Sequence, residues 1–288
     1  MEKLFNIIRR SAFFNHILRV LGIFGIDRWC IRIMYKWFEQ HPTEEMRKTT
    51  TYFKNHRDDI VRIQRYLADD KSREIWKKMI RFRMTMDYRY HPDEEKDQYF
   101  VDGIMQLGEK EVFIDCGGYD GQTTLDFIEK CQGRYQKIVI FEPDDKCLPM
   151  IHKKLKNDKR IKVISKGVWD TETHLSFVSS GDSASHVVEA GGASQKTDVI
   201  SVVSIDRCDE CRDATFIKMD LEGAEQRALK GAEQTIKRNT PKLAICIYHS
   251  DEDMIKIIDY LHNLVPEYKL YVRHHSTAAI ETVVYAVK

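Results

Sequence analysis

The stretch that decides the fold is Glu111-Val112-Phe113-Ile114-Asp115-Cys116-Gly117-Gly118-Tyr119-Asp120-Gly121-Gln122-Thr123. An apolar, β-prone run breaks into a glycine-rich turn, and a helix is expected to follow it. This order predicts the first strand, loop and helix of a nucleotide-type α/β fold. The glycines at 117 and 121 let backbone N–H groups approach a bound molecule closely, and a helix start behind them favours negative charge. The turn is therefore a predicted ligand site.

A second apolar run, Lys137 to Phe141, ends in Glu142, which stands 21 residues after Gly121. An acid at that place can bind two ribose hydroxyls, so loop and acid together predict an adenosine-containing cofactor. A dinucleotide fingerprint needs three glycines, and Cys116 occupies the place of the first. The remaining pattern, acid-x-Gly-x-x-x-Gly, resembles the loop of class I S-adenosylmethionine methyltransferases.

The composition of the chain limits the classes of molecule that it is expected to bind. The 288 residues, 42% of them hydrophobic, can bury one full core with roughly 90 residues beyond a single α/β domain. Forty-six basic and 45 acidic side chains leave a net charge of +1, which gives no broad field for nucleic acid and favours a small-molecule or glycan acceptor. Seven cysteines, an odd number, and the lack of a signal peptide predict a cytoplasmic location. The longest apolar run in the N-terminal region, Val20 to Ile26, is too short to span a membrane.

The N-terminal part is predicted to be helical. Residues 1–40 mix basic and aromatic side chains, as an interfacial membrane helix does, but Gly22 and Gly25 interrupt the periodicity. Packing of these residues on the catalytic domain or on a second copy of the chain is therefore favoured over membrane contact. Helices are expected over 44–67 and 72–87, and a third from Pro92. We accordingly predict a helical accessory region over 1–105 and a cofactor-binding domain over 106–288.

Strands and helices alternate from residue 111 onward, which predicts a mostly parallel sheet. Two further strand-like runs, 268–273 and 281–287, are typical of a terminal antiparallel hairpin and bring the expected sheet to seven strands. The polar, glycine-bearing segment 179–198 is a candidate substrate lid. The expected strands are 111–115, 137–141, 161–165, 215–219 and 242–248, and the expected helices are 123–131, 145–156, 223–238 and 251–263.

A second group of polar residues follows the strand that ends at Met219. Asp220 and Glu222 should face the same crevice as Glu142, because parallel strands place their carboxyl ends at one edge of the sheet. The next strand ends near His249, which points to the same edge. A simpler interpretation is that Asp220 or Glu222 caps the following helix, while Glu225 favours the dipole of its first turn.

A histidine beside carboxylates suits proton abstraction from a hydroxyl. The same Asp220, Glu222 and His249 could instead hold a divalent cation that lowers the hydroxyl's pKa. The sequence leaves both mechanisms open. Cys208 and Cys211 have the spacing of a redox or zinc pair, but no second pair follows them, so a metal there is not favoured.

With both groups identified, the chain from about Gln98 onward resembles the FkbM family of S-adenosylmethionine-dependent methyltransferases. The family often has alanine where this chain has Gly118, and the glycine is expected only to loosen the turn. The blocks that carry the resemblance are VFIDCGGYDGQTT, IVIFEPD, KGVWD, FIKMDLEGAEQRALKGA, PKLAICIYH and YVRHHS.

The resemblance implies a Rossmann-like class I methyltransferase fold and an O-methyltransferase acting on sugars of surface polysaccharides or on secondary metabolites. Asp220, Glu222 and His249 would face the reacting hydroxyl. A nucleic-acid enzyme is disfavoured because Met219-Asp220-Leu221-Glu222 stands where amino-directed enzymes have Asn/Asp-Pro-Pro-Tyr/Phe. A non-catalytic scaffold of the same fold is a further alternative. The expected cofactor contacts are Tyr99, Asp115, Gly117, Gly118, Gly121, Thr123, Glu142, Gly167 and Asp220.

Overall fold

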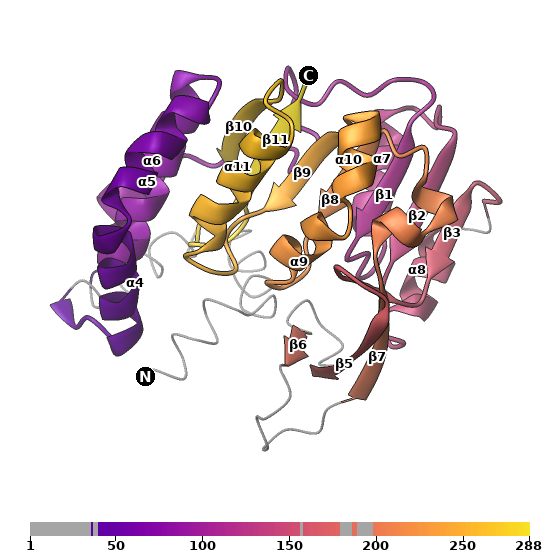
Figure 1. Ribbon diagram of the computed structural model, residues 1–288, viewed down its shortest axis with the longest axis horizontal. Helices are drawn as coiled ribbons and strands as arrows, with labels where there is room; N and C mark the ends of the chain where they lie inside the picture. Colours follow the sequence, from indigo (N-terminus) through magenta and orange to yellow (C-terminus); the bar gives the residue numbers. More distant parts are fainter. Residues whose placement is uncertain (1–35, 37–39, 156–157, 179–185, 189–197) are drawn as a thin grey trace, which may run out of the picture.

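The computed structural model describes residues 36, 40–155, 158–178, 186–188 and 198–288 (Figure 1). Its main sheet has seven strands in the order β10-β11-β9-β8-β1-β2-β3. Only β11 runs antiparallel to its neighbours, so the predicted, mostly parallel sheet with a terminal hairpin is confirmed. The strands are β1 Val112–Cys116, β2 Lys137–Phe141, β3 Ile161–Ile164, β8 Phe216–Met219, β9 Lys242–Cys246, β10 Lys269–His274 and β11 Thr282–Val287.

The central strands are apolar throughout because both faces of the sheet are covered. Every residue of β1 and β8 is buried, which is the pattern of parallel strands enclosed between helices. One face packs aromatic rings, with Phe113 and Phe127 stacked at 4.4 Å between ring centroids. The helices of this domain are α7 Gln122–Lys130, α8 Leu148–Leu155, α9 Glu225–Lys230, α10 Glu233–Asn239 and α11 Asp253–Leu264.

The expected helix over 223–238 is in fact two helices. Gly231 lies between them, and a β-carbon there would stand 2.0 Å from the carbonyl oxygen of Trp169. The helix therefore breaks where it packs against another backbone. The carboxylate of Asp206 then accepts the N–H groups of Gln234 and Thr235 and caps α10.

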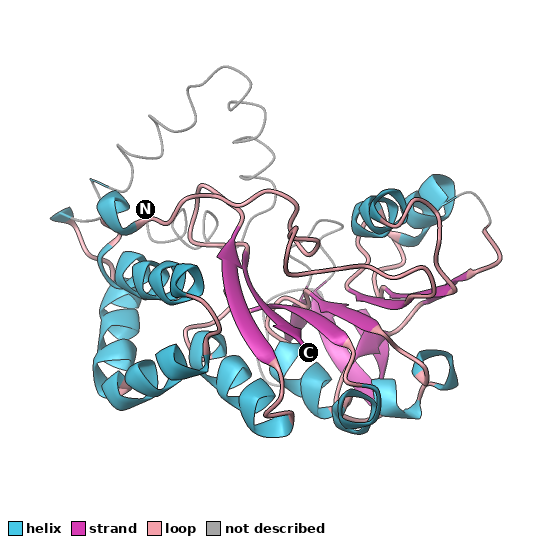
Figure 2. Cartoon of the chain, turned by 90° about the horizontal axis from the view of Figure 1, so that it is seen from above, coloured by secondary structure: helices cyan, strands magenta, loops and turns pink. Residues whose placement is uncertain are grey.

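The N-terminal helices stand beside β10 at one end of the main sheet (Figures 1 and 2). They are α4 Glu44–Asn55, α5 Arg57–Tyr66 and α6 Asp70–Thr85, so the run expected over 44–67 breaks at His56. A short 3₁₀ turn, Tyr88–Tyr90, follows α6. The third predicted helix, from Pro92, is absent from the described residues, because Asp97 and Tyr99 have φ of 58° and 70° in the left-handed region.

These helices share a hydrophobic core with the sheet. Phe53 of α4 and Trp76 of α6 belong to the same buried cluster as Leu261 of α11 and Val272 of β10. Phe100 belongs to the cluster on the other face, beside Phe113. The boundary proposed near residue 105 therefore has buried contacts across it, and a two-domain division stays a prediction.

A second, smaller sheet of four strands has the order β4-β7-β5-β6. Its strands are β4 Gly167–Val168, β5 Thr173–Val178, β6 His186–Val188 and β7 Asp198–Val203. The segment predicted as a lid, 179–198, falls outside the described residues except at β6 and at the start of β7. The prediction for residues 1–40 likewise lies outside them except at 36 and 40. No helix among the described residues is long and apolar enough to cross a membrane.

Candidate active site

The glycine loop joins β1 to α7 and packs directly on the turn after β8. Gly117 has φ of 88°, and a β-carbon there would lie 2.0 Å from the carbonyl oxygen of Asp220. Gly121 has φ of 80° and begins α7 from the left-handed region. Gly118 has no such dihedral, but its β-carbon would lie 2.3 Å from Cγ2 of Ile140. An alanine at 118 would therefore press its methyl group against β2 in this chain, and the expectation that the glycine only loosens the turn stays a prediction.

A buried ion pair supports the loop from below. The Asp115 carboxylate lies 3.1 Å from Nζ of Lys218, and both side chains are at most 2% exposed. Lys218 also donates to the carbonyl of Gly117 at 2.7 Å, and Thr124 donates its hydroxyl to Asp115. Burial lowers the pKa of Lys218, but the neighbouring Asp115 and Asp220 outweigh it and raise the pKa above its usual range. Asp115 thus shapes the loop, and its contact with a cofactor stays a prediction.

Glu142 lies at the end of β2 and faces the loop. Its Oε2 accepts the N–H of Tyr119 at 2.7 Å and its Oε1 accepts the N–H of Asp144 at 2.8 Å. The side chain is 7% exposed, and this burial raises its pKa to about 7. Each oxygen keeps a second lone pair, so the carboxylate can accept hydrogen bonds from two ribose hydroxyls as well.

The remaining predicted cofactor residues lie around this loop and differ in how far they are buried. Thr123 is half-buried on the first turn of α7. Gly167 is buried in β4, and a β-carbon there would lie 3.9 Å from Pro143, the neighbour of Glu142. Tyr99 is buried, and its ring lies 5.3 Å from Nζ of Lys218. Their roles in cofactor binding stay predictions.

Asp220 is fixed at the end of β8 by two tyrosines. Tyr99 donates to Oδ2 at 2.8 Å, and Tyr248 donates to Oδ1 at 3.1 Å. Burial raises the pKa of Asp220, but the positive charges of Lys218 and His249 outweigh it and lower the pKa below its usual value. Asp220 is therefore an ionised hydrogen-bond acceptor, and each of its oxygens is held by a tyrosine hydroxyl.

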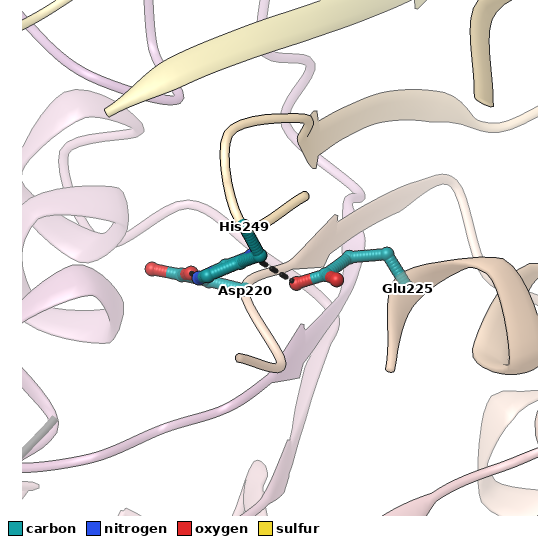
Figure 3. A group of neighbouring side chains, drawn as sticks. All are labelled: Asp220, Glu225 and His249. Atoms are coloured by element: carbon teal, nitrogen blue, oxygen red, sulfur yellow. Dashed lines mark ion pairs between the residues drawn. The ribbon is translucent and has the colours of Figure 1, made fainter. Parts of the chain in front are cut away.

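His249 stands among three carboxylates, and Figure 3 shows its ring between Asp220 and Glu225. Nδ1 lies 3.0 Å from Oε1 of Glu225, and Nε2 lies 3.4 Å from Oδ1 of Asp220 and 3.6 Å from Oε2 of Glu222. Burial lowers the pKa of the histidine, but Glu225 and Glu222 outweigh it, so the pKa lies well above its usual value. The ring is 9% exposed, and neither nitrogen has an aligned hydrogen-bond partner in the described residues.

This geometry bears on the predicted cation site. Ligand atoms of Asp220, Glu225 and His249 lie within 4.8 Å of one another, so the set differs from the expected one by having Glu225 in place of Glu222. The nearest carboxylates, however, approach opposite nitrogens of the ring. One ion cannot use both nitrogens of one imidazole, so the arrangement is that of a charged ring between acids more than of a chelate.

Glu222 and Glu281 complete the acidic surroundings. Glu222 has φ of 53°, and burial raises its pKa although His249 opposes the rise. Glu281, just before β11, accepts a hydrogen bond from Gln98. Burial, followed by the charge of Asp220, raises its pKa to about 7.

The N-terminal helices reach the site through one arginine. Arg83 of α6 is 2% exposed and donates from Nη1 to the carbonyl of Tyr248 at 2.9 Å. It also forms a 2.9 Å ion pair with Asp251, which accepts the hydroxyl of Thr49 in α4. The segment that carries His249 is therefore held in place by α4 and α6.

Several of these residues were not predicted as site residues. The sequence did contain an indication for Lys218, because a lysine inside an apolar strand is unusual and needs a buried partner. Tyr248 also had one, since it directly precedes His249. Arg83, Gln98 and Glu281 gave none, because their partners are distant in sequence. Cys208 and Cys211 are free thiols away from this group, and a hydrogen bond between the two lowers the pKa of Cys208 to about 6.

Comparison with known proteins identifies the class. The sequence matches the FkbM methyltransferase domain over residues 115–268. The crystal structure of methyltransferase FkbM from Methylobacillus flagellatus KT is similar, with a TM-score of 0.70, 26% identity, and coverage of 82% of this chain and 60% of that one. This chain thus spans about three fifths of the length of that protein. No curated protein matches the sequence significantly.

Two solved structures are less similar. An rRNA methylase from Streptococcus thermophilus has a TM-score of 0.40 and 13% identity, with coverage of 62% of this chain and 87% of that one. Fibrillarin of Aeropyrum pernix with bound S-adenosyl-L-methionine has a TM-score of 0.41 and 13% identity, with coverage of 64% of this chain and 70% of that one.

The fold is that of the class I methyltransferases, as predicted. The chain belongs to the FkbM methyltransferase domain family, because the match covers more than half of it. The resemblance to this family that was drawn from the sequence is thereby confirmed.

Proposed function

We propose that this protein transfers the methyl group of S-adenosylmethionine to a hydroxyl of a sugar or glycoside, such as a surface polysaccharide or its precursor. The observation that carries the proposal is the meeting of Asp220, Glu222 and His249 at strand ends beside the glycine loop. These groups can accept hydrogen bonds and a proton from a hydroxyl. The backbone of Asp220 lies against Gly117 of the loop, which brings this group next to the proposed cofactor site.

The residues present fit the cofactor. Glu142 would accept hydrogen bonds from its ribose, and the loop around Gly117 and Gly121 would accommodate its methionine end. When bound, S-adenosylmethionine supplies an electrophilic methyl group on a cationic sulfur. Ionised carboxylates such as Asp220 favour that positive charge in a buried site.

The acceptor oxygen must lie in line with the methyl group and lose its proton as the bond forms. Asp220, fixed by Tyr99 and Tyr248, is suited to orient the hydroxyl. His249 and its neighbouring acids interact closely, so they take up the proton as a coupled group. Several carboxylates beside one another can hold the adjacent hydroxyls of one sugar, which favours a polyhydroxylated acceptor.

The test is methyl transfer from radiolabelled S-adenosylmethionine to a panel of glycosides, with the methylated oxygen located by NMR. His249→Ala should lose about 10²- to 10⁴-fold in turnover while affinity for S-adenosylhomocysteine stays unchanged. Labelling of a phenolic or polyketide acceptor in place of every glycoside would favour the alternative of secondary-metabolite methylation. If calorimetry detected no binding of S-adenosylmethionine, the remaining interpretation would be a non-catalytic scaffold of the same fold.

A divalent cation is the alternative to direct proton uptake, with Asp220, Glu222 and His249 as its proposed ligands. Chelation by EDTA should abolish activity if the cation lowers the hydroxyl's pKa. Activity that persists in EDTA and in His249→Ala would contradict both mechanisms and leave alignment of the reactants as the source of rate.

The proposed partners follow from this function. The balanced charge of the chain fits a small or glycan acceptor and not a nucleic acid. Residues 1–40 are proposed to contact a membrane surface, a second copy of the chain or the chain's own core. The proposed location is the cytoplasm. Co-sedimentation with anionic vesicles and analytical ultracentrifugation, each with and without residues 1–40, separate these possibilities.

A further inference from the structure

Glu225 is the most deeply buried acid beside the proposed acceptor position. Its side chain is 0% exposed, although it begins α9. A buried carboxylate is unfavourable unless hydrogen bonds and a positive charge surround it. The contacts of this side chain therefore show what the fold uses it for.

Two of these contacts are with the turn between β8 and α9. Oε1 accepts the N–H of Leu221 at 2.6 Å, and Oε2 accepts the N–H of Gly223 at 3.1 Å. The residue between them, Glu222, has a left-handed φ of 53°. The turn that presents Asp220 and Glu222 is thus wrapped around the Glu225 carboxylate.

The third contact is with His249, whose Nδ1 lies 3.0 Å from Oε1. This contact is an ion pair without hydrogen-bond alignment, and it is favourable when Nδ1 carries a proton because the carboxylate is negatively charged. Nε2 then faces Asp220 and Glu222, where the acceptor hydroxyl is proposed to bind. A helix-dipole role explains little of this, because α9 has only six residues.

We propose that Glu225 is a positioning residue that holds the acid turn and the His249 ring in one geometry, with the proton kept on Nδ1 and with Nε2 directed toward the acceptor. This inference rests on the proposed function for its consequence in turnover, but the state of the ring can be tested without an acceptor. Glu225 itself does not touch the reacting atoms; it acts through His249.

The first measurement is the ¹⁵N spectrum of histidine-labelled protein, with the His249 signals assigned by their loss in His249→Ala. The proposal requires a protonated Nδ1 in the unaltered protein, and an unprotonated Nδ1 there would overturn it. Glu225→Gln keeps the size of the side chain and removes its charge, so the charged ring should lose a proton and Nδ1 should no longer stay protonated. Unchanged signals in this variant would also overturn the proposal.

Asp253→Asn is the matched control. Asp253 is also buried, accepts hydrogen bonds from Gln226 and from the N–H of Ser250, and forms no ion pair with His249 in the described residues. The charges of Asp253 and His249 interact without an ion-pair contact, so its replacement should leave Nδ1 of His249 protonated. A comparable change in this variant would mean that any nearby buried acid sets the ring's state, and the special role of Glu225 would fall.

Turnover gives the second measurement, on whichever acceptor the glycoside panel yields. Glu225→Gln should lower kcat on the order of 10²- to 10⁴-fold, the range of a general acid–base contribution, with affinity for S-adenosylhomocysteine unchanged. The double variant Glu225→Gln/His249→Ala should be no slower than His249→Ala, since both act through one ring. Multiplying losses would contradict the proposal. A wild-type protein without turnover but with a protonated Nδ1 would refute the function and leave the positioning role standing.

Discussion

At the scale of single residues, Glu142 shows how a site can be prepared for a ligand before the ligand binds. Two backbone N–H groups fix its carboxylate, while burial keeps its pKa near 7. The sequence predicted its position from the spacing to the glycine loop. The raised pKa was not predictable, because it comes from the burial of the carboxylate in the folded chain, against the opposing effect of the Tyr119 and Asp144 N–H groups.

The raised pKa of Glu142 predicts a pH dependence of cofactor binding. Ribose hydroxyls donate to the ionised carboxylate, so binding favours the deprotonated form and releases a proton from the fraction that is protonated. Affinity for S-adenosylhomocysteine should therefore be constant above pH 7 and fall below it, by up to about tenfold per pH unit. Calorimetry between pH 6 and pH 8 measures this.

Glu142→Gln is the control for that dependence. The amide keeps the shape of the side chain and does not titrate, so affinity should be lower at pH 8 and nearly flat with pH. A slope like that of the unaltered protein would show that another group is responsible and would argue against Glu142 as the ribose ligand.

At the scale of elements, the sequence predicted what depends on local pattern. The strands ending near Asp115, Glu142 and Asp220 were placed within a few residues, because buried parallel strands are apolar runs with a sharp polar end. The breaks at His56 and Gly231 were missed, since they depend on which backbone packs against the helix. The candidate acids and His249 were predicted to lie at the same edge of the sheet. That carboxylates approach opposite nitrogens of the imidazole was not predictable, because it depends on the tertiary structure.

Arg83 of α6 makes a contact between elements that the local sequence pattern cannot predict. Its partner Asp251 is 168 residues away in sequence, yet the pair holds the segment that carries Tyr248 and His249. Arg83→Met leaves Asp251 without this cation and should lower the free energy of unfolding by about 3 kcal/mol. Chemical denaturation measures the loss, and turnover should fall as well because His249 is displaced.

Arg81→Met is the matched control on the same helix. Arg81 is exposed and lies over the ring of Tyr90, 4.3 Å from its centroid. Its loss should change the free energy of unfolding by roughly 1 kcal/mol or less. Equal losses in the two variants would contradict an anchoring role for Arg83.

At the scale of the whole molecule, a group of histidines connects two parts of the chain. One part is the segment that follows the N-terminal helices, and the other is the terminal hairpin. His91 and His274 have their Nε2 atoms 3.3 Å apart, and His275 lies 2.8 Å from the hydroxyl of Tyr285. The backbone of Glu95 donates to the carbonyl of His274 in the same region. This contact region is thus built from one buried imidazole, His274, and two half-buried ones, His91 and His275.

Burial lowers the pKa of His91 and of His275 to about 4, and that of His274 well below its usual value. The unfolded chain takes up protons on these rings near pH 6.5, whereas the folded protein does not. Stability is therefore fully present above pH 6.5 and is lost as the pH falls from there toward 4. Each partly buried ring contributes on the order of 2–3 kcal/mol to this loss.

The last prediction is that His91→Phe flattens the fall in stability between pH 6.5 and pH 4. Phenylalanine keeps the ring that stacks on Tyr88 but cannot take up a proton in the unfolded chain. The free energy of unfolding, measured in urea at several pH values, should then decline less steeply than in the unaltered protein. His152→Gln, at an exposed position on α8, should keep the original slope. Parallel curves for His91→Phe and the unaltered protein would show that acid sensitivity arises elsewhere, and this group of histidines would not be its cause.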